Sequence, residues 1–192
     1  MYGLVNKAIQ DMVCSRFGEE TWKVIKHKAE VDVDVFISME GYPDDITHRL
    51  VKAASGVLGL SPREIMQAFG EFWVQYTAEE GYGEMMDMSG DTLPEFLENL
   101  DNLHARVGVS FPKLQPPSFQ CTDMEENSLN LHYRSDREGL TPMILGLVKG
   151  LGTRFDTQVH ITQTQSRDEG GEHDEFLVIY KKNSELRSQN SV

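Results

Sequence analysis

One histidine of the chain has surroundings that suit metal coordination. His104 lies four residues after Leu100 and seven after Leu97, so it falls on the apolar side of its predicted helix. A histidine on such a face must be paired by hydrogen bonds, as core histidines usually are, or must bind something. Iron in a porphyrin needs one neutral imidazole nitrogen on a rigid element, which a helix provides. His104 is therefore a candidate axial iron ligand, and a hydrogen-bonded core histidine is the alternative.

The other five histidines are less suited to that role because their surroundings are polar. His27, His48 and His173 lie among charged residues. His132 and His160 occupy the polar positions of predicted strands.

A second group of polar side chains lies at alternate positions of a predicted strand. In residues 129–137 the odd positions are Leu, Leu, Tyr, Ser and Arg, and the even positions from 130 to 136 are polar. Alternate side chains of a strand share a face, so Tyr133, Ser135 and Arg137 are predicted to point the same way. This row suits an amphiphilic ligand with an acidic rim, because arginine binds carboxylates through two hydrogen bonds. A strand end that emerges into solvent would give the same pattern.

The first two thirds of the chain, which must help to position these groups, has the apolar periodicity of helices. Apolar stripes predict helices over residues 4–17 and 19–29. A third helix, capped by Asp44 or Asp45, is predicted to end near Gly59.

Two capping boxes predict where the next helices begin. Ser61 is the predicted N-cap of one helix, with Pro62 as its first residue and Glu64 as the capping partner. The sequence Thr-Leu-Pro-Glu at residues 92–95 repeats the pattern and opens the helix that carries His104. Residues 81–90 form at most a short helix.

The pattern changes after the prolines at positions 112, 116 and 117, which cannot continue a helix. The fold class is α+β, with a helical lobe over about residues 1–60 and a lobe of antiparallel sheet with helices over about residues 61–180. The polar tail from Lys181 is predicted to be disordered. In the second lobe we expect strands over 129–137, 159–165 and 175–180, a helix over 141–151 and a hairpin turn at 168–171.

Composition excludes several classes of protein. The formal net charge of −13 repels phosphate backbones, which argues against a nucleic-acid partner. No apolar run of about 18 residues is present, so we expect no membrane span, and we find no signal peptide. Cys14 and Cys121 are far apart and outside any zinc-ligand spacing, which favours a reducing cytoplasmic setting and two small buried side chains.

A helical histidine followed about 30 residues later by Tyr-x-Ser-x-Arg resembles the H-NOX family, which includes the haem domain of the β subunit of soluble guanylate cyclase. The resemblance runs from Met1 to about Tyr180. Besides Tyr-x-Ser-x-Arg, the matching stretches are Met-Tyr-Gly-Leu-Val-Asn at 1–6, Glu-Asn-Leu-Asp-Asn-Leu-His at 98–104, Pro-Pro-Ser-Phe at 116–119 and Arg-Glu-Gly-Leu at 137–140.

The resemblance implies haem b (iron protoporphyrin IX), held noncovalently between the lobes. His104 would ligate iron on the proximal side, and Pro117 would press on the porphyrin and distort it. Asp44 resembles the acidic residue that pairs with the propionate-binding arginine. The propionates themselves would be bound by Tyr133, Ser135 and Arg137.

The distal pocket predicts which gas binds. Oxygen-binding members of the family resemble one another in a distal tyrosine at the start of the helix after the propionate motif, and Met143 stands there in this chain. We therefore expect ferrous haem that binds nitric oxide and carbon monoxide and binds oxygen poorly. The predicted distal residues are Val5, Ile9, Trp73, Met143 and Leu147.

The output implied by the resemblance acts in trans. Weakening or release of the iron–His104 bond would signal to a histidine kinase or a cyclic-nucleotide enzyme. The chain has no GxxxxGK[ST], GxSxG or HExxH motif, so we expect no enzymatic activity of its own. The spacing of Gly146, Gly150 and Gly152 predicts a closely packed helix rather than a phosphate loop.

Three alternatives stay open on the sequence. A haem enzyme would need a distal acid–base residue, and the predicted distal positions offer none. A module without haem is disfavoured only by the joint presence of His104 and the propionate motif. An oxygen carrier or oxygen sensor is disfavoured by Met143.

Overall fold

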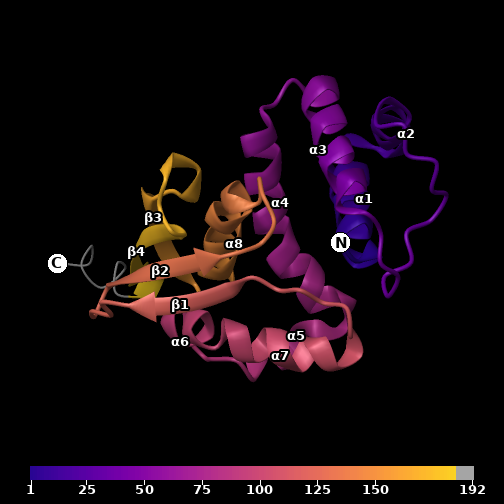
Figure 1. Ribbon diagram of the computed structural model, residues 1–192. Helices are drawn as coiled ribbons and strands as arrows, with labels where there is room; N and C mark the ends of the chain where they lie inside the picture. Colours follow the sequence, from indigo (N-terminus) through magenta and orange to yellow (C-terminus); the bar gives the residue numbers. More distant parts are fainter. Residues whose placement is uncertain (185–192) are drawn as a thin grey trace.

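The computed structural model describes residues 1–184, and its first three helices form one packed group (Figure 1). These helices are α1 (Gly3–Phe17), α2 (Glu19–Lys28) and α3 (Asp44–Leu58). Their apolar stripes meet in a core in which Ile9, Ile25 and Leu50 are almost completely buried. The three predicted helices are confirmed, with bounds that differ by one or two residues.

The predicted capping of α3 by an aspartate side chain is wrong. The N-cap of α3 is Pro43, and no side chain caps the helix. Asp44 instead accepts hydrogen bonds from the ammonium group of Met1 and from Arg137. Charged donors make stronger hydrogen bonds than backbone amides, so the carboxylate faces them instead of its own helix.

Helix α4 (Pro62–Thr77) begins as predicted. The Ser61 side chain accepts a hydrogen bond from the Glu64 amide, and the Glu64 carboxylate accepts one from the Ser61 amide. The helix continues into one π-helical turn, η1 (Ala78–Tyr82), where Gly81 has a φ of 100°. The short helix α5 (Gly83–Asp87) follows, as expected for residues 81–90.

The single helix predicted after residue 92 is two helices, α6 (Leu93–Glu98) and α7 (Leu100–Ser110). The backbone breaks at Asn99, with φ −96° and ψ 5°, and the Asn99 side-chain amide donates to the carbonyl of Glu95. Asparagine side chains compete with helical backbone hydrogen bonds in this way. His104 therefore lies on a separate helix, in its second turn.

Within residues 1–184, four antiparallel strands form one sheet in the order β1-β2-β4-β3. The structure adds β1 (Ser118–Thr122), which we did not predict, and pairs it with β2 (Ser128–Arg134). The central strand β4 (Asp174–Lys182) pairs with β2 on one side and with β3 (Thr157–Gln165) on the other.

Two predicted boundaries in this lobe are wrong. The strand predicted over 129–137 ends at Arg134, because the next residues form a turn. The disorder predicted from Lys181 is wrong for Lys181 and Lys182, because both belong to β4 and Lys182 pairs with Thr157 in the sheet. Residues 185–192, the rest of that prediction, lie outside the described residues. The β3–β4 hairpin turns through a 3₁₀ helix, η2 (Arg167–Glu169), close to its predicted place.

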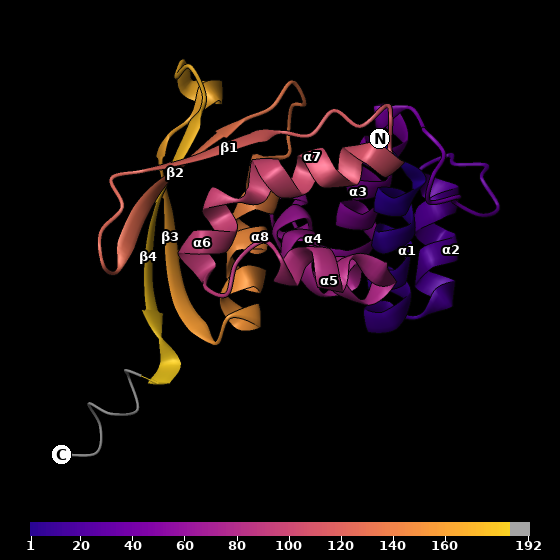
Figure 2. The ribbon, with the colours of Figure 1, turned by 90° about the horizontal axis from the view of Figure 1, so that it is seen from below.

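Helices cover only one face of the sheet (Figure 2). Helix α8 (Thr141–Arg154) lies between the sheet and α4, and α6 lies beside it on the same side. Within residues 1–184 no helix covers the outer face.

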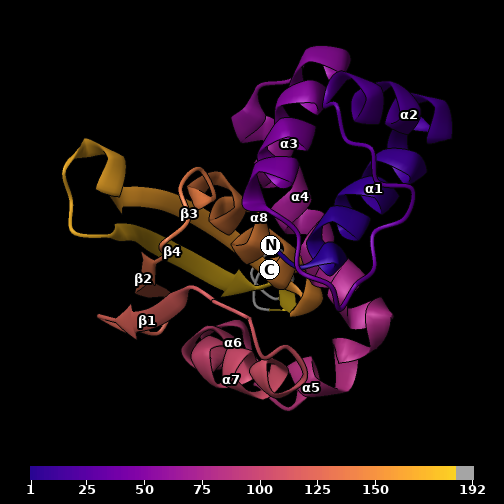
Figure 3. The same cartoon turned by 45° about the vertical axis from the view of Figure 1, so that its right-hand side comes forward.

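Helix α8 packs closely on α4, with backbone atoms of the two helices in contact (Figure 3). A methyl group at Gly146 would overlap the carbonyl of Gln67 on α4, and one at Gly70 would overlap the carbonyl of Met143 on α8. The prediction that the glycines of this helix permit close packing is thereby confirmed. Among the described residues, no helix has the length and apolar character needed to cross a bilayer.

Candidate functional site

A cavity of about 470 Å³ lies between the first helical group and the sheet, within the size range of small-molecule sites. Its walls come from α1, α4, α7, α8, the end of β2 and the loop that precedes β1. Nine of the ten site residues predicted from the sequence line it, namely Val5, Trp73, His104, Pro117, Tyr133, Ser135, Arg137, Met143 and Leu147.

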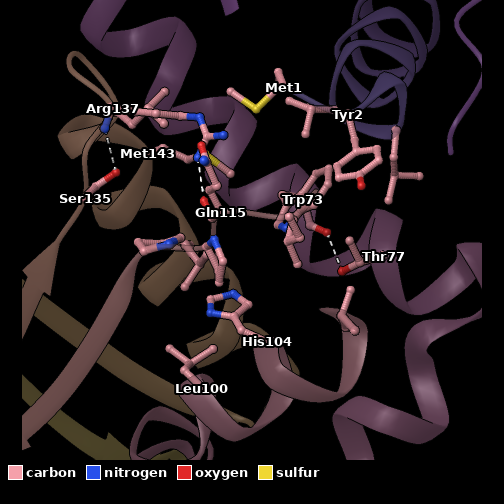
Figure 4. A pocket seen from close by; sticks show the side chains of 18 of the residues that line it. Met1, Tyr2, Trp73, Thr77, Leu100, His104, Gln115, Ser135, Arg137 and Met143 are labelled. Carbon is pink, nitrogen blue, oxygen red and sulfur yellow. Dashed lines mark hydrogen bonds between the residues drawn. The ribbon is translucent and has the colours of Figure 1, made fainter. Parts of the chain in front are cut away.

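His104 points from α7 into this cavity (Figure 4). Its Nδ1 atom is buried and has no hydrogen-bond partner within residues 1–184. Burial lowers the pKa of the ring below its usual value, although the Asp101 charge and the nearby Pro117 carbonyl act in the opposite direction. The ring is therefore neutral near pH 7. A core histidine held by hydrogen bonds would have a partner, so the geometry favours the ligand interpretation.

The helix of His104 is fastened to the sheet by Asp101, three residues before the histidine. The Asp101 carboxylate accepts hydrogen bonds from the Phe119 amide at 2.8 Å and from the Ser118 hydroxyl at 2.9 Å. The Phe119 ring then lies beside the His104 ring, with centroids 5.9 Å apart. Strand β1, which the sequence did not predict, thus fixes the position of the histidine.

Tyr133 is buried on β2 and shares its face with Leu129 and Leu131, as the alternation predicted. It stands opposite Phe119 in the sheet, with ring centroids 5.4 Å apart. Burial raises the pKa of the Tyr133 phenol, so the hydroxyl stays protonated and can donate a hydrogen bond.

Ser135 and Arg137 reach the cavity by a different route from the one that the alternation predicted. They follow the end of β2, and the Ser135 hydroxyl accepts a hydrogen bond from the Arg137 amide at 3.1 Å, which closes a turn. Arg167, on the β3–β4 hairpin, donates to the carbonyl oxygens of Ser135 and Arg137. No pattern in the sequence pointed to this role of Arg167, because the contact joins segments 30 residues apart.

The Arg137 guanidinium is held at the rim of the cavity by two acceptors. Its Nε donates to the Asp44 carboxylate at 3.0 Å, and its Nη1 donates to the Gln115 carbonyl at 2.6 Å. Partial burial opposes ionisation of Asp44, but the Met1 ammonium and Arg137 outweigh it and lower the pKa of this carboxyl. The pairing of Asp44 with Arg137, which the resemblance implied, is present.

The predicted distal residues line the cavity, with the exception of Ile9. Trp73 on α4 lines the cavity with Met143 and Leu147 on α8. Its indole N–H donates to no acceptor in the described part of the chain, and is therefore available to a ligand. Ile9 does not line the cavity, because it lies one turn beyond Val5 on α1, about 6 Å further along the axis, and is buried in the helical core.

Of the loop that closes one side of the cavity, sequence reasoning identified only Pro117. Phe111, Leu114 and Gln115 all line it. Tyr2 holds this loop, since its hydroxyl accepts a hydrogen bond from the Lys113 amide at 2.9 Å and its ring meets Phe111 edge-on at 4.8 Å. The prolines of the loop were the only signal, and apart from Pro117, which the resemblance placed against the porphyrin, they indicated only a boundary between lobes.

The donor set fits an amphiphilic iron porphyrin. The cavity has a mostly apolar lining, an unpartnered imidazole on one wall and an arginine with two hydroxyls near its rim. Figure 4 shows the His104 ring and the Arg137 side chain on different sides of the same space.

Comparison with known proteins also indicates a haem-binding family. A model of the Haem-NO-binding family (HNOB) matches residues 2–163. Two soluble guanylate cyclases of Caenorhabditis elegans, gcy-35 and gcy-31, are 30% and 33% identical over 100% and 84% of this chain. The chain spans only 29% and 23% of their lengths.

Solved structures share the fold at low sequence identity. An H-NOX protein from S. oneidensis in the Fe(II)NO ligation state has a TM-score of 0.86 and 20% identity, covering 95% of this chain and 100% of that one. An unliganded Fe(II) H-NOX protein from K. algicida has a TM-score of 0.83 and 21% identity, covering 95% and 98%. The chain belongs to the Haem-NO-binding family and has the α+β fold of the H-NOX domains, a family of haem-based gas sensors.

Proposed function

We propose that residues 1–180 form one sensor domain that binds nitric oxide and carbon monoxide at ferrous haem b, binds oxygen poorly and has no catalytic activity of its own. The observation that carries this proposal is the neutral, unpartnered His104 in the same cavity as Arg137. Family membership supports the cofactor, and the lining residues support the choice of gas. A cytoplasmic location stays an expectation based on cysteine usage.

Residues of this chain would hold the cofactor at two places, its iron and its propionate groups. His104 would provide the iron ligand, and Pro117 would press on the ring from the loop before β1. At the rim, Tyr133, Ser135 and Arg137 would bind the propionates, with Arg137 already fixed by Asp44 and Gln115. When bound, haem would supply a ferrous coordination position at which a diatomic gas binds.

The distal residues favour nitric oxide over oxygen. Bound oxygen is polarised and is usually stabilised by a hydrogen-bond donor, whereas nitric oxide and carbon monoxide need that donor much less. Met143 and Leu147 offer no donor, and the indole N–H of Trp73 is the exception among the predicted distal residues. The absence of a tyrosine at position 143 therefore supports poor oxygen binding.

The same contacts suggest how the signal leaves the site. Binding of nitric oxide to the haem would weaken the bond that His104 makes to the cofactor, and α7 would then lose one of its attachments. Helix α7 would remain tied to β1 through Asp101, and its movement would therefore reach the sheet. A histidine kinase or a cyclic-nucleotide enzyme would read this change in trans, and the relatives named soluble guanylate cyclases are consistent with the second.

The visible absorption spectrum of the anaerobically reduced protein tests the proposal, measured before and after addition of nitric oxide. We expect a haem band whose position shows one axial histidine at first and loss of that histidine after the gas is added. A spectrum that keeps the histidine would leave haem binding intact and remove bond release from the mechanism. A protein that takes up no haem would refute the function.

Three further observations separate the alternatives. Stable oxygen binding by the native protein in air would favour an oxygen sensor, and rapid turnover of peroxide would favour a haem enzyme. In His104→Gly supplied with free imidazole, the cofactor would keep a ligand, but α7 would no longer be bonded to the cofactor. Normal signalling by that variant to a partner enzyme would rule out α7 as the transmitter.

A further inference from the structure

We propose that the outer face of the sheet carries a second metal site, for Zn²⁺, formed by His132, His173 and Glu175. One ligand atom from each of these side chains lies within 4.8 Å of the other two. The site is independent of the haem proposal, because all three side chains lie outside the haem cavity.

Strand pairing brings the three residues together. His132 on β2 stands directly opposite Glu175 on β4, and His173 immediately precedes β4. Neighbouring Tyr133 faces inward, so His132 faces outward, where no helix of the described chain covers the sheet. Sequence reading placed these two histidines among polar positions 41 residues apart, and only the sheet order joins them.

The distances are close to those of a coordination sphere. The Nδ1 atom of His132 lies 2.8 Å from Nε2 of His173 and 3.5 Å from Oε2 of Glu175. Zinc bonds of about 2.0–2.2 Å in a tetrahedron place neighbouring ligand atoms roughly 3.4 Å apart. Small rotations of the side chains are sufficient to open the histidine pair and admit the ion.

Neighbouring hydroxyls orient two of the ligands. The Nε2 atom of His132 is 2.7 Å from the Thr122 hydroxyl on β1. When Nε2 donates to that hydroxyl, Nδ1 presents its lone pair to the site. The second oxygen of Glu175 accepts a hydrogen bond from the Thr164 hydroxyl at 2.9 Å. Partners of this kind fix the orientation of the ligands in metal sites.

The cluster is largely shielded from solvent. The other ring nitrogen of His173, Nδ1, is buried and has no partner among residues 1–184. The side chains of His132 and Glu175 are only 13% and 25% exposed, so water reaches the group poorly. The ligand atom of His173 in this geometry is Nε2, so its Nδ1 is left for an ordered water outside the site.

The donor set selects the metal. Two imidazoles and one carboxylate suit Zn²⁺, whereas Mg²⁺ and Ca²⁺ prefer oxygen ligands only. Three protein ligands leave a fourth position for water. The net charge of −13 raises the local concentration of cations.

Equilibrium dialysis of tag-free, haem-loaded protein against buffered free Zn²⁺, followed by elemental analysis, tests this proposal. We expect one bound zinc per chain, in addition to the iron. His132→Gln and His173→Gln should each weaken the affinity at least tenfold. His160→Gln is the matched control, because it removes an exposed histidine from the outer face of β3 and should leave the affinity unchanged.

Two measurements keep the test independent of folding. Thermal unfolding without zinc shows whether each variant is folded, and added zinc should raise Tm of the native protein but not of the two histidine variants. Thr122→Val keeps every ligand and removes only the orienting hydroxyl, and we expect about a tenfold loss of affinity. If His132→Gln, His173→Gln and Thr122→Val all bind zinc as the native protein does, or if the native protein binds none, the proposed site does not exist.

Discussion

The contact between α4 and α8 makes Gly146 the position at which one methyl group should disturb the molecule most. In Gly146→Ala the new carbon would overlap the Gln67 carbonyl oxygen and lie 2.8 Å from its carbon atom. Ordinary contacts begin near 3.4 Å, so the two helices must separate. The obstacle is backbone, which cannot rotate away as a flexible side chain can.

Two opposing terms set the size of the effect. Overpacking in a rigid contact destabilises by about 3 kcal/mol. Alanine in place of glycine inside a helix stabilises by about 1 kcal/mol. The free energy of unfolding should therefore fall by roughly 2 kcal/mol, and for a chain of this length Tm should fall by about 4–8 °C. Helix separation should also change the cavity, because α4 carries Trp73 and α8 carries Met143.

Gly56→Ala is the matched control. Gly56 lies in α3, and a methyl group there meets no atom within 4 Å. Only the helical preference remains, so Tm should rise by a few degrees, roughly 2–4 °C. Differential scanning calorimetry of both variants separates the two terms. If Gly146→Ala unfolds at or above the native temperature, the close approach of the two backbones is not a property of the protein in solution.

Four further perturbations test the site and its surroundings. Arg137→Ala should weaken haem retention about tenfold, the usual loss for a charge-assisted hydrogen bond, when haem transfer to apomyoglobin is followed; unchanged retention would exclude a role in propionate binding. Met143→Tyr should allow a stable oxygen spectrum in air, and its failure to do so would show that a missing donor is not what excludes oxygen. The pKa of Asp44 is lowered from 3.8, so its contribution to stability is present above pH 3.8 and is lost as pH falls through the lower pKa of the folded state. Asp44→Asn should therefore be less stable than the native protein in urea unfolding at about pH 5, and the two stabilities should converge in stronger acid. Partial burial raises the pKa of Cys121 to about 12, so iodoacetamide at about pH 8 should leave this half-buried thiol unmodified in the folded protein, and rapid alkylation detected by mass spectrometry would contradict the raised pKa.

Local patterns predicted the elements well wherever a local cause decides them. The capping box at Ser61 marks the beginning of α4 because both of its hydrogen bonds join residues three apart. Strand β1 escaped prediction because Ser118–Thr122 is only five residues long and takes its place by pairing with β2. The break at Asn99 was hidden by an apolar stripe that continues across it.

The same distinction between local causes and contacts of distant segments applies to the candidate site. His104 was found because its type and its helical phase are both visible in the sequence. Ser135 and Arg137 line the cavity because of the turn after β2, and not because of the strand alternation on which their prediction rested. Arg167, Gln115 and the His132 cluster depend on contacts between distant segments, and no single segment shows them.

The strand order has a consequence for folding during synthesis on the ribosome. Of the strands in residues 1–184, β4 is synthesised last, yet it lies between β2 and β3 and joins them. Until it emerges, the hairpin of β1 and β2 and the strand β3 each present an unpaired edge, which is a template for association with other chains. The first three helices can gather beforehand from near-neighbour contacts, whereas the sheet must close in one late step. A chain that stalls before residue 174 would therefore lack the centre of its sheet rather than its margin.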